Sequence, residues 1–412
     1  MSEQDGNTEN NNFFEEAVEY VPNQMSRLIS FLSALWLSTA ATAQSALPGF
    51  PDLTLFPDLV TIAKNKAQNE IQAITDPLGK GAAFVGGSLC STVKPIVGVG
   101  YGNFVEEPDM SKLTLVYITS GKTVIYNLTQ AAVEMPKEEW FDPQCRMLVY
   151  MHGFTDNPQK TSFQTIRLAA EEGLGDCVSI LALDASSLIK FFYLRASTIV
   201  TFIGRTLGAT LAALVSSGLE PAKIHLIGHS LGSHISGSAG KEFLKRTGHK
   251  VGRLSALDPA GPCFSDVAPA LRLTKNDAAF VEVIHSDAGV YGLDQKIGHV
   301  DFWPNSGSEQ PGCLLQTCSH SRAWEYFAES MSTRRAFLSI QCSSYYSFRQ
   351  SKCNTSDTIV MGYDTPANAT GDYYLITAGQ SPYGLGAMGT AYEGTSFIRE
   401  AGFNIKDQLF HG

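Results

Sequence analysis

The chain has 412 residues, of which 44% are hydrophobic and 17% charged, and its formal net charge at pH 7 is −10. This length and apolar content are enough for a large buried core and exclude a mainly disordered chain. The sequence contains no basic cluster, so we expect no nucleic-acid partner.

The first 43 residues have the composition of a leader. Residues 1–24 are acidic and Asn-rich and contain no Lys or Arg, which predicts a disordered segment upstream of the working start. Residues 25–43 begin with Met25 and Arg27, continue as an apolar run and end in Ala41-Thr-Ala43, the pattern of a secretory signal peptide. A membrane anchor is the alternative, although the apolar run is short for a span. We therefore predict an extracellular protein that begins at Gln44.

The rest of the chain divides into an N-terminal extension, a large domain over 111–384 and a C-terminal tail over 385–412. Residues 44–110 form an N-terminal extension, in which 57–74 has the apolar spacing of an amphipathic helix. A hairpin follows, and from residue 146 strands alternate with helices, which predicts a mostly parallel central sheet with helices on both faces. The hairpin strands are 113–119 and 123–128, the later strands are 146–152, 178–184, 223–228, 251–258, 280–285 and 300–303, and the helices are 159–172, 197–217 and 321–331.

Eight cysteines follow the signal peptide and imply disulfides formed in an oxidising compartment. Short loop closure favours two local bonds, and a third would attach the N-terminal extension to the domain. The expected bonds are Cys313–Cys318, Cys342–Cys353 and Cys90–Cys177, with Cys145 and Cys263 as free buried thiols. Sequons at Asn127, Asn354 and Asn368 predict N-glycosylation.

A G-x-S-x-G pattern, Gly228-His-Ser230-Leu-Gly232, lies between a short apolar strand and a helix rich in small residues. In that setting the pattern is typical of a nucleophile elbow, a sharp strand-to-helix turn that presents one serine hydroxyl. An ordinary tight turn is the alternative. We expect Ser230 to have a strained backbone, with Gly228 and Gly232 avoiding collisions across the turn. The small residues of the helix indicate close packing on the sheet.

A serine nucleophile needs a base and a third group that orients the base. Asp258 ends the next predicted strand, where its carboxylate would project beside the elbow. Asp184 also ends a strand but precedes the serine, and the later Asp266, Asp277 and Asp287 lack that setting. Of the later histidines, His285 lies within a strand and His299 just before one. His320 lies in a predicted loop ahead of a helix, so it is the expected base.

The tetrahedral oxyanion of acyl transfer also needs hydrogen-bond donors. The residue after the nucleophile, Leu231, offers one backbone N–H. An apolar strand breaks at Gly153, which would expose the N–H of Phe154 as the second donor.

Seven segments in order over 112–384 resemble the pancreatic-lipase family, closest to its insect lipase and venom phospholipase A1 branch. The segments are YMHGFTDN, IHLIGHSLGSHISG, ALDPAGPCF, VEVIHSD, IGHVDFWPNSG, PGCLLQTCSHSRAWEYFAES and IVMGYDTP. The resemblance implies an α/β-hydrolase fold and a lipase catalytic domain over 111–384. It also implies a catalytic triad of Ser230, Asp258 and His320, with an oxyanion hole of Phe154 and Leu231.

Departures from the family pattern refine these expectations. Pancreatic lipases add a C-terminal β-sandwich that docks a colipase, but here the stretch after the catalytic domain is a tail, 385–412, so neither is expected. The family's calcium loop carries two carboxylates after an Arg-Leu pair. Here Arg272-Leu is followed by Thr274 in place of one carboxylate, with Asp277 as the other. We therefore expect no metal ion and no cofactor.

The loop matching the family's lid consists of Cys313, Leu314, Leu315, Gln316, Thr317 and Cys318. With its ends joined it projects only ~8 Å, too short to cover a cleft holding a lipid. The neighbouring loop 287–298 carries Asp287, Asp294 and Lys296, which predicts an open and partly polar rim.

This rim favours a secreted serine hydrolase of phospholipase A1 type, acting on lipid esters at a membrane or lipoprotein surface. A neutral triacylglycerol or galactolipid lipase is one alternative. A yolk-like lipid-binding storage protein with a relic triad is another.

Overall fold

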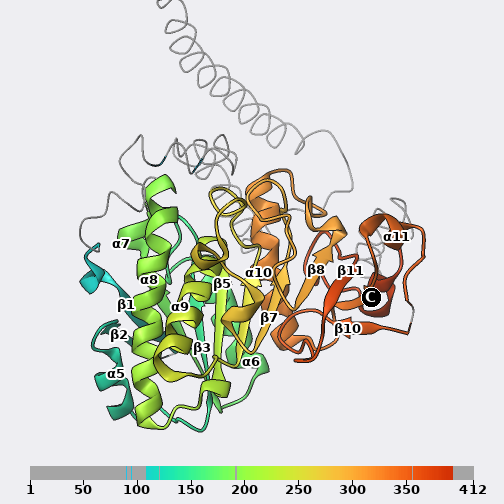
Figure 1. Ribbon diagram of the computed structural model, residues 1–412. Coiled ribbons are helices and arrows are strands. Elements are labelled where there is room, and N and C mark those ends of the chain that lie inside the picture. The colour runs from blue at the N-terminus through green and yellow to red at the C-terminus, as the bar shows by residue number, and fades with distance from the viewer. Residues whose placement is uncertain are drawn as a thin grey trace, which may run out of the picture. The chain divides into compact units, whose positions relative to one another are not determined.

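The computed structural model describes Cys90, Lys94 and residues 108–119, 121–190, 193–354 and 356–392. The predicted leader, the signal peptide and the helix over 57–74 lie outside these residues. The described chain forms an eleven-stranded sheet in the order β10-β9-β11-β8-β7-β6-β5-β3-β4-β1-β2 (Figure 1). The strands are β1 (Thr114–Ile118), β2 (Thr123–Asn127), β3 (Arg146–Met151), β4 (Val178–Asp184), β5 (Ile224–His229), β6 (Arg253–Leu257), β7 (Phe280–Ile284), β8 (Val300–Pro304), β9 (Leu338–Gln341), β10 (Thr358–Val360) and β11 (Gly371–Leu375).

The centre of the sheet is parallel. Strands β4, β3, β5, β6, β7, β8 and β11 pair in parallel, each with its neighbour in that order. The hairpin β1–β2 is antiparallel and joins β4, while β9 and β10 close the opposite edge. The predicted hairpin and the predicted mostly parallel sheet are therefore confirmed. β9 and β10 were not expected.

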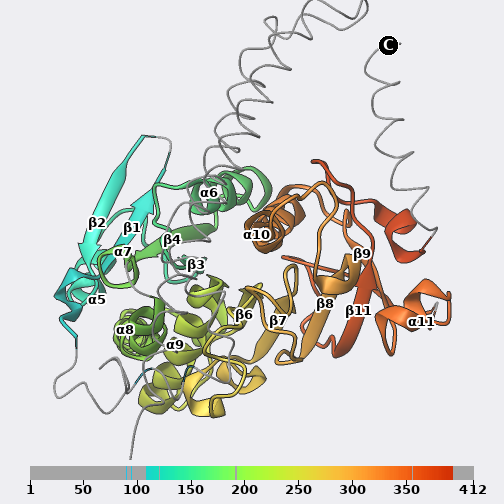
Figure 2. The same cartoon turned by 90° about the horizontal axis from the view of Figure 1, so that it is seen from above.

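Helices cover both faces of the sheet. Figure 2 shows α8 (Tyr193–Leu214) and α9 (Leu231–Thr247) on one face and α6 (Thr161–Gly173) and α10 (Gln316–Ser332) on the other. The shorter helices are α5 (Ala131–Glu134), α7 (Ser186–Ile189) and α11 (Tyr345–Arg349). The predicted layered arrangement is confirmed.

The two largest apolar clusters of the core lie on opposite faces of the sheet. In β5, Leu226 belongs to the cluster under α8 and α9, whereas Ile227 belongs to the cluster under α6 and α10. This alternation follows from the two-residue period of a strand, and because both faces are covered, every residue of β5 is buried.

Close packing of α8 on α9 explains the small residues of both helices. A Cβ on Gly204 would lie 2.4 Å from the Ser238 Cβ, and a Cβ on Gly208 would lie 2.4 Å from the Ala239 carbonyl oxygen. The small face of α9 therefore packs on α8 as well as on the sheet. The segment Tyr193–Ser217 is long and apolar enough to cross a membrane, but more than half of it is buried within the fold, as in a core helix.

Four disulfides link the described cysteines, and one of the three predicted pairings, Cys90–Cys177, was wrong. Cys313–Cys318 and Cys342–Cys353 form as expected, but Cys90 pairs with Cys263, and Cys145 pairs with Cys177. Neither Cys145 nor Cys263 is a free thiol. The reason is strand register: Arg146 pairs with Val178 at the start of β3 and β4, so the cysteines that precede these two residues lie side by side.

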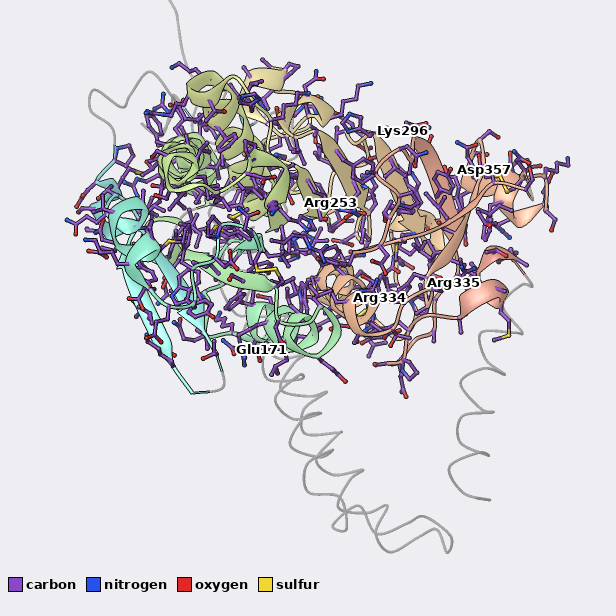
Figure 3. The ribbon with its side chains drawn as sticks, turned by 90° about the horizontal axis from the view of Figure 1, so that it is seen from below. Glu171, Arg253, Lys296, Arg334, Arg335 and Asp357 are labelled. Carbon is purple, nitrogen blue, oxygen red and sulfur yellow. A yellow bond between two sulfur atoms is a disulfide. The ribbon has the colours of Figure 1, made fainter. Side chains whose placement is uncertain are left out.

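An arginine at the start of β6 links the sheet to the segment after β10. Figure 3 labels this residue, Arg253. Its guanidinium lies 2.8 Å from the buried Glu282 carboxylate and donates to the carbonyl oxygens of Gly362 and Thr365. These bonds attach the segment after β10 to β6, the strand that Asp258 directly follows.

Candidate active site

Ser230 occupies the sharp turn between β5 and α9. Its φ of 56° and ψ of −120° lie outside the regions favoured by residues with a side chain, as predicted for a nucleophile elbow. A Cβ on Gly228 would lie 2.4 Å from the Gly232 carbonyl oxygen, which confirms the expected collision across the turn. The reason for Gly232 differs, because a Cβ there would lie 2.0 Å from the carbonyl oxygen of Met151 at the end of β3.

The structure brings Asp258 and His320 together beside this turn. The His320 Nδ1 lies 2.5 Å from the Asp258 Oδ2, and the other oxygen of Asp258 accepts hydrogen bonds from the N–H groups of Ser286 and Asp287. The carboxylate is fully buried, so these bonds hold it in one orientation. Within the described part of the chain the Ser230 hydroxyl donates no hydrogen bond; such contacts often tighten only when substrate binds.

His320 lies within α10, so the prediction that it occupies a loop was wrong. Helix α10 begins four residues earlier, at Gln316, and places the imidazole over the carboxyl ends of the strands. The His320 carbonyl oxygen lies 3.1 Å from His229 Nε2, and the His320 ring packs against the rings of His229 and Tyr291. Burial lowers the pKa of His320, but the bond to Asp258 and the charges of Asp258 and Asp287 more than offset this and raise it.

The other candidate bases have different partners. His285 is fully buried, with its Nε2 2.9 Å from Asp301 Oδ1 and its ring stacked on Trp303. His299 accepts a hydrogen bond from the Val281 N–H at the far end of β7. Neither histidine reaches Asp258 through the contacts of the described residues.

The two expected oxyanion donors come from two segments next to Ser230, the start of α9 and the turn after β3. Leu231 is the first residue of α9, where the backbone N–H has no partner within the helix. Phe154 lies in the turn after β3, and its ring packs edge-on against Tyr193 at 5.3 Å between centroids. A Cβ on the intervening Gly153 would lie 3.0 Å from the Ser230 Cβ, so glycine lets this turn approach the serine.

Asp287 lies beside Asp258 and His320, although it was not predicted as an active-site residue. It is buried, and its Oδ2 accepts a hydrogen bond from the Tyr291 N–H, whereas its Oδ1 has no partner among the described residues. Atoms of Asp258, Asp287 and His320 lie within 4.8 Å of one another. The strand order could have predicted this position. Asp287 follows β7, the neighbour of β6, so it lies at the same edge of the sheet as Asp258.

This cluster fits proton transfer better than metal binding. Three residues of types that can bind a metal lie close together, but the Asp258 carboxylate already binds the imidazole and two backbone N–H groups. A metal ion bound to the Asp258 Oδ2 would compete with the imidazole for that oxygen. Burial, and then the charge of Asp258, raise the pKa of Asp287 to about 7, so its carboxyl changes charge near neutral pH.

Replacing Asp287 with Asn should shift the pH dependence of ester hydrolysis. A charged Asp287 raises the pKa of His320, and a base must be neutral to accept a proton. In Asp287→Asn the acid limb of the kcat/KM profile should therefore move to lower pH. Asp294→Asn, an exposed change in the same loop, is the control, and superimposable profiles for Asp287→Asn and the unchanged protein would contradict the assignment.

The same substitution should change the pH dependence of stability. Folding raises the pKa of Asp287 from its ordinary value of about 4 to about 7, so in that window the native state binds a proton that the unfolded state has released. The stability contributed by this carboxyl therefore falls as the pH rises towards 7. Thermal unfolding of Asp287→Asn should lack this part of the slope.

The loops around the site differ in part from the expectation. Cys313 and Cys318 are bonded with their Cα atoms 5.4 Å apart, and Gln316, Thr317 and Cys318 already belong to α10, so only Leu314 and Leu315 project. Leu314 is 97% exposed. The neighbouring loop 287–298 is less polar at its surface than predicted. Asp287 is buried beside His320, whereas the apolar side chain of Val290 is exposed.

A strained serine between a parallel strand and a helix, with an acid–histidine pair at the same sheet edge, defines an α/β-hydrolase. The chain belongs to the Lipase family, whose sequence profile matches residues 103–383.

The sequence is similar to pancreatic lipases of mammals. The chain is 36% identical over 248 residues to pancreatic lipase-related protein 2 of Mus musculus, covering 52% of this chain and 48% of that protein. It is 33% identical over 229 residues to pancreatic triacylglycerol lipase of Equus caballus, covering 49% and 48%. The chain thus spans about half the length of the relatives it matches. A phospholipase/carboxylesterase from Dyadobacter fermentans matches at a TM-score of 0.26 and 14% identity, covering 35% of this chain and 67% of that one.

Proposed function

We propose that this protein is a secreted serine hydrolase that cleaves lipid carboxyl esters with phospholipase A1-type specificity. Ser230 attacks the ester carbonyl, His320 takes its proton and returns it to the leaving alcohol, and Asp258 holds the imidazole in the required tautomer. The N–H groups of Leu231 and Phe154 stabilise the oxyanion. The observation that carries the proposal is the 2.5 Å contact between His320 Nδ1 and the buried Asp258 beside the strained serine.

The short lid loop supports a phospholipid substrate. Only Leu314 and Leu315 project between the disulfide and α10, too little chain to cover a bound lipid. An uncovered site admits a charged or sugar headgroup without removing its water, which is costly for a charged group.

A neutral triacylglycerol lipase is the second candidate, because the loops near the site also expose apolar side chains. Leu314 is 97% exposed and Val290 42% exposed. Both could contact an oil surface, which carries no headgroup charge to recognise.

Parallel assays on phosphatidylcholine vesicles and on a long-chain triglyceride emulsion separate the two candidates. We expect faster release of fatty acid from phosphatidylcholine, and no abrupt rise in rate when triglyceride passes its solubility limit. Ser230→Ala is the matched control for both substrates. Fast triglyceride hydrolysis with strong interfacial activation, and no phospholipid hydrolysis, would refute the phospholipase assignment.

Four disulfides support an extracellular location. Asn354 and Asn368 are exposed and suit glycosylation. Asn127 is half-buried, and its side-chain amide donates to the Ser111 carbonyl oxygen, which makes it the least accessible of the three.

A further inference from the structure

Helix α9, which follows the nucleophile elbow, packs directly on the loop 272–277. A Cβ on Gly240 would lie 2.0 Å from the Asp277 carbonyl oxygen, and a Cβ on Gly237 would lie 2.9 Å from the Asp277 Oδ2. Glycine at both positions therefore brings the helix backbone against the loop. In the family that this chain belongs to, the corresponding loop is the calcium loop.

A lysine of α9 enters this loop and binds its oxygens. The Lys241 Nζ lies 2.6 Å from the Asp277 Oδ2 and 2.8 Å from the Arg272 carbonyl oxygen. Asp277 is only 3% exposed, so its carboxylate needs a cation or donors nearby. The ammonium supplies the cation.

Both carboxylate oxygens of Asp277 also accept hydrogen bonds from Thr274. Thr274 N–H donates to Asp277 Oδ2, and Thr274 Oγ1 donates to Asp277 Oδ1. Ca²⁺ needs six to eight oxygen ligands at about 2.3–2.6 Å. An ion bound to Arg272 O and Asp277 Oδ2 would have to take the position of the ammonium, because two cations at that separation repel strongly. The residues present therefore do not fit a calcium ion.

We propose that the Lys241 ammonium is the resident cation of the loop 272–277, so that the loop needs no divalent metal ion. A charge carried on the helix itself replaces a dissociable ion. From the sequence, Thr274 in place of a carboxylate led only to the expectation that no metal ion binds; the structure adds the group that occupies the cation position.

The loop connects to the candidate active site through a histidine. The Leu273 N–H donates to His234 Nδ1, and His234 Nε2 lies 2.9 Å from the Ala260 carbonyl oxygen. Burial lowers the pKa of His234 to about 3, so the ring is neutral and its Nε2–H is the donor to Ala260. The Ala260 N–H in turn donates to the Ser230 carbonyl oxygen. Lys241 therefore helps to position the elbow.

The first test compares Lys241→Met with Lys245→Met, an exposed lysine one turn further along α9. Lys241→Met leaves the buried Asp277 without its cation and should lower Tm by about 5 °C or more. Lys245→Met should leave Tm unchanged. Equal Tm values for the two variants would overturn the proposal.

The second test measures metal dependence in the unaltered protein, so it does not require a variant to fold. Tm should be the same in millimolar Ca²⁺ and in EDTA, and elemental analysis of the purified protein should find no stoichiometric calcium. A calcium-dependent rise in Tm, or one bound calcium per chain, would refute the proposal.

A double variant, Lys241→Ala with Thr274→Asp, removes the ammonium and restores the second carboxylate. We expect it to gain Ca²⁺ binding by calorimetry and a Tm that rises with Ca²⁺. Failure to bind Ca²⁺ would contradict the claim that the ammonium occupies the cation position.

A separate measurement tests whether Lys241 positions the elbow. It rests on the proposed role of Ser230 as the nucleophile. The rate of fluorophosphonate labelling, measured below the unfolding transition of either variant, should fall in Lys241→Met and not in Lys245→Met. Equal rates would remove the positioning role. The Tm and calcium measurements do not depend on catalysis, so they remain valid if the proposed function fails.

Discussion

Ser230→Ala should reduce ester hydrolysis by about 10⁴-fold or more while leaving the protein folded. The hydroxyl is the only group of this residue that attacks the substrate, and removing it leaves the elbow backbone and both oxyanion donors in place. Hydrolysis of a soluble p-nitrophenyl ester measures the loss without the complication of an interface. An unchanged Tm would show that the loss is chemical and not structural.

Covalent labelling gives a second measurement of the same prediction. A fluorophosphonate should label the unaltered protein and Ser216→Ala, an exposed serine near the end of α8, but not Ser230→Ala. Labelling that persists in Ser230→Ala would mean that another residue is the nucleophile. An unaltered protein that takes no label would favour the storage protein with a relic triad.

His320→Ala should cost about as much as Ser230→Ala, because the members of a triad act as a unit. Without the imidazole the Ser230 hydroxyl loses its proposed base, and Asp258 loses the partner that its buried carboxylate binds at 2.5 Å. The loss should appear in kcat more than in KM, since the imidazole acts on the reacting atoms.

The comparison with His299→Ala makes this prediction specific. His299 accepts a hydrogen bond from the Val281 N–H and lies away from the acid at the carboxyl end of β6. Its replacement should change activity by no more than a few-fold. If His299→Ala or His285→Ala abolished hydrolysis while His320→Ala did not, the base would be misassigned.

Features that depend on neighbouring residues could be predicted from the sequence. The strained turn at Ser230 requires glycine on both sides, and the alternation of apolar strands with helices dictates a parallel sheet covered on both faces. β4 appears with the predicted bounds, Val178–Asp184. The start of the helix that carries His320 was predicted too far along the chain, because the first turn of this helix is polar and is constrained by a disulfide.

Features that depend on which strands lie side by side could not be predicted in the same way. The disulfide Cys145–Cys177 follows from the pairing of β3 with β4, and Cys90–Cys263 joins residues 173 positions apart. The disulfides were predicted from the low entropy cost of closing a short loop. That cost favours bonds between nearby cysteines and gives no information about distant ones.

The sequence by itself determined the nucleophile motif, the fold class and a short list of acids and bases. The tertiary structure decided which members of that list meet: it brought His320 to Asp258, placed Asp287 beside both, and put the Lys241 ammonium among the oxygens of the loop 272–277. The physical reason is that proton transfer and charge pairing act over a few ångströms. Distances of that size between segments far apart in the chain are set by strand order and helix packing, which local sequence patterns do not encode.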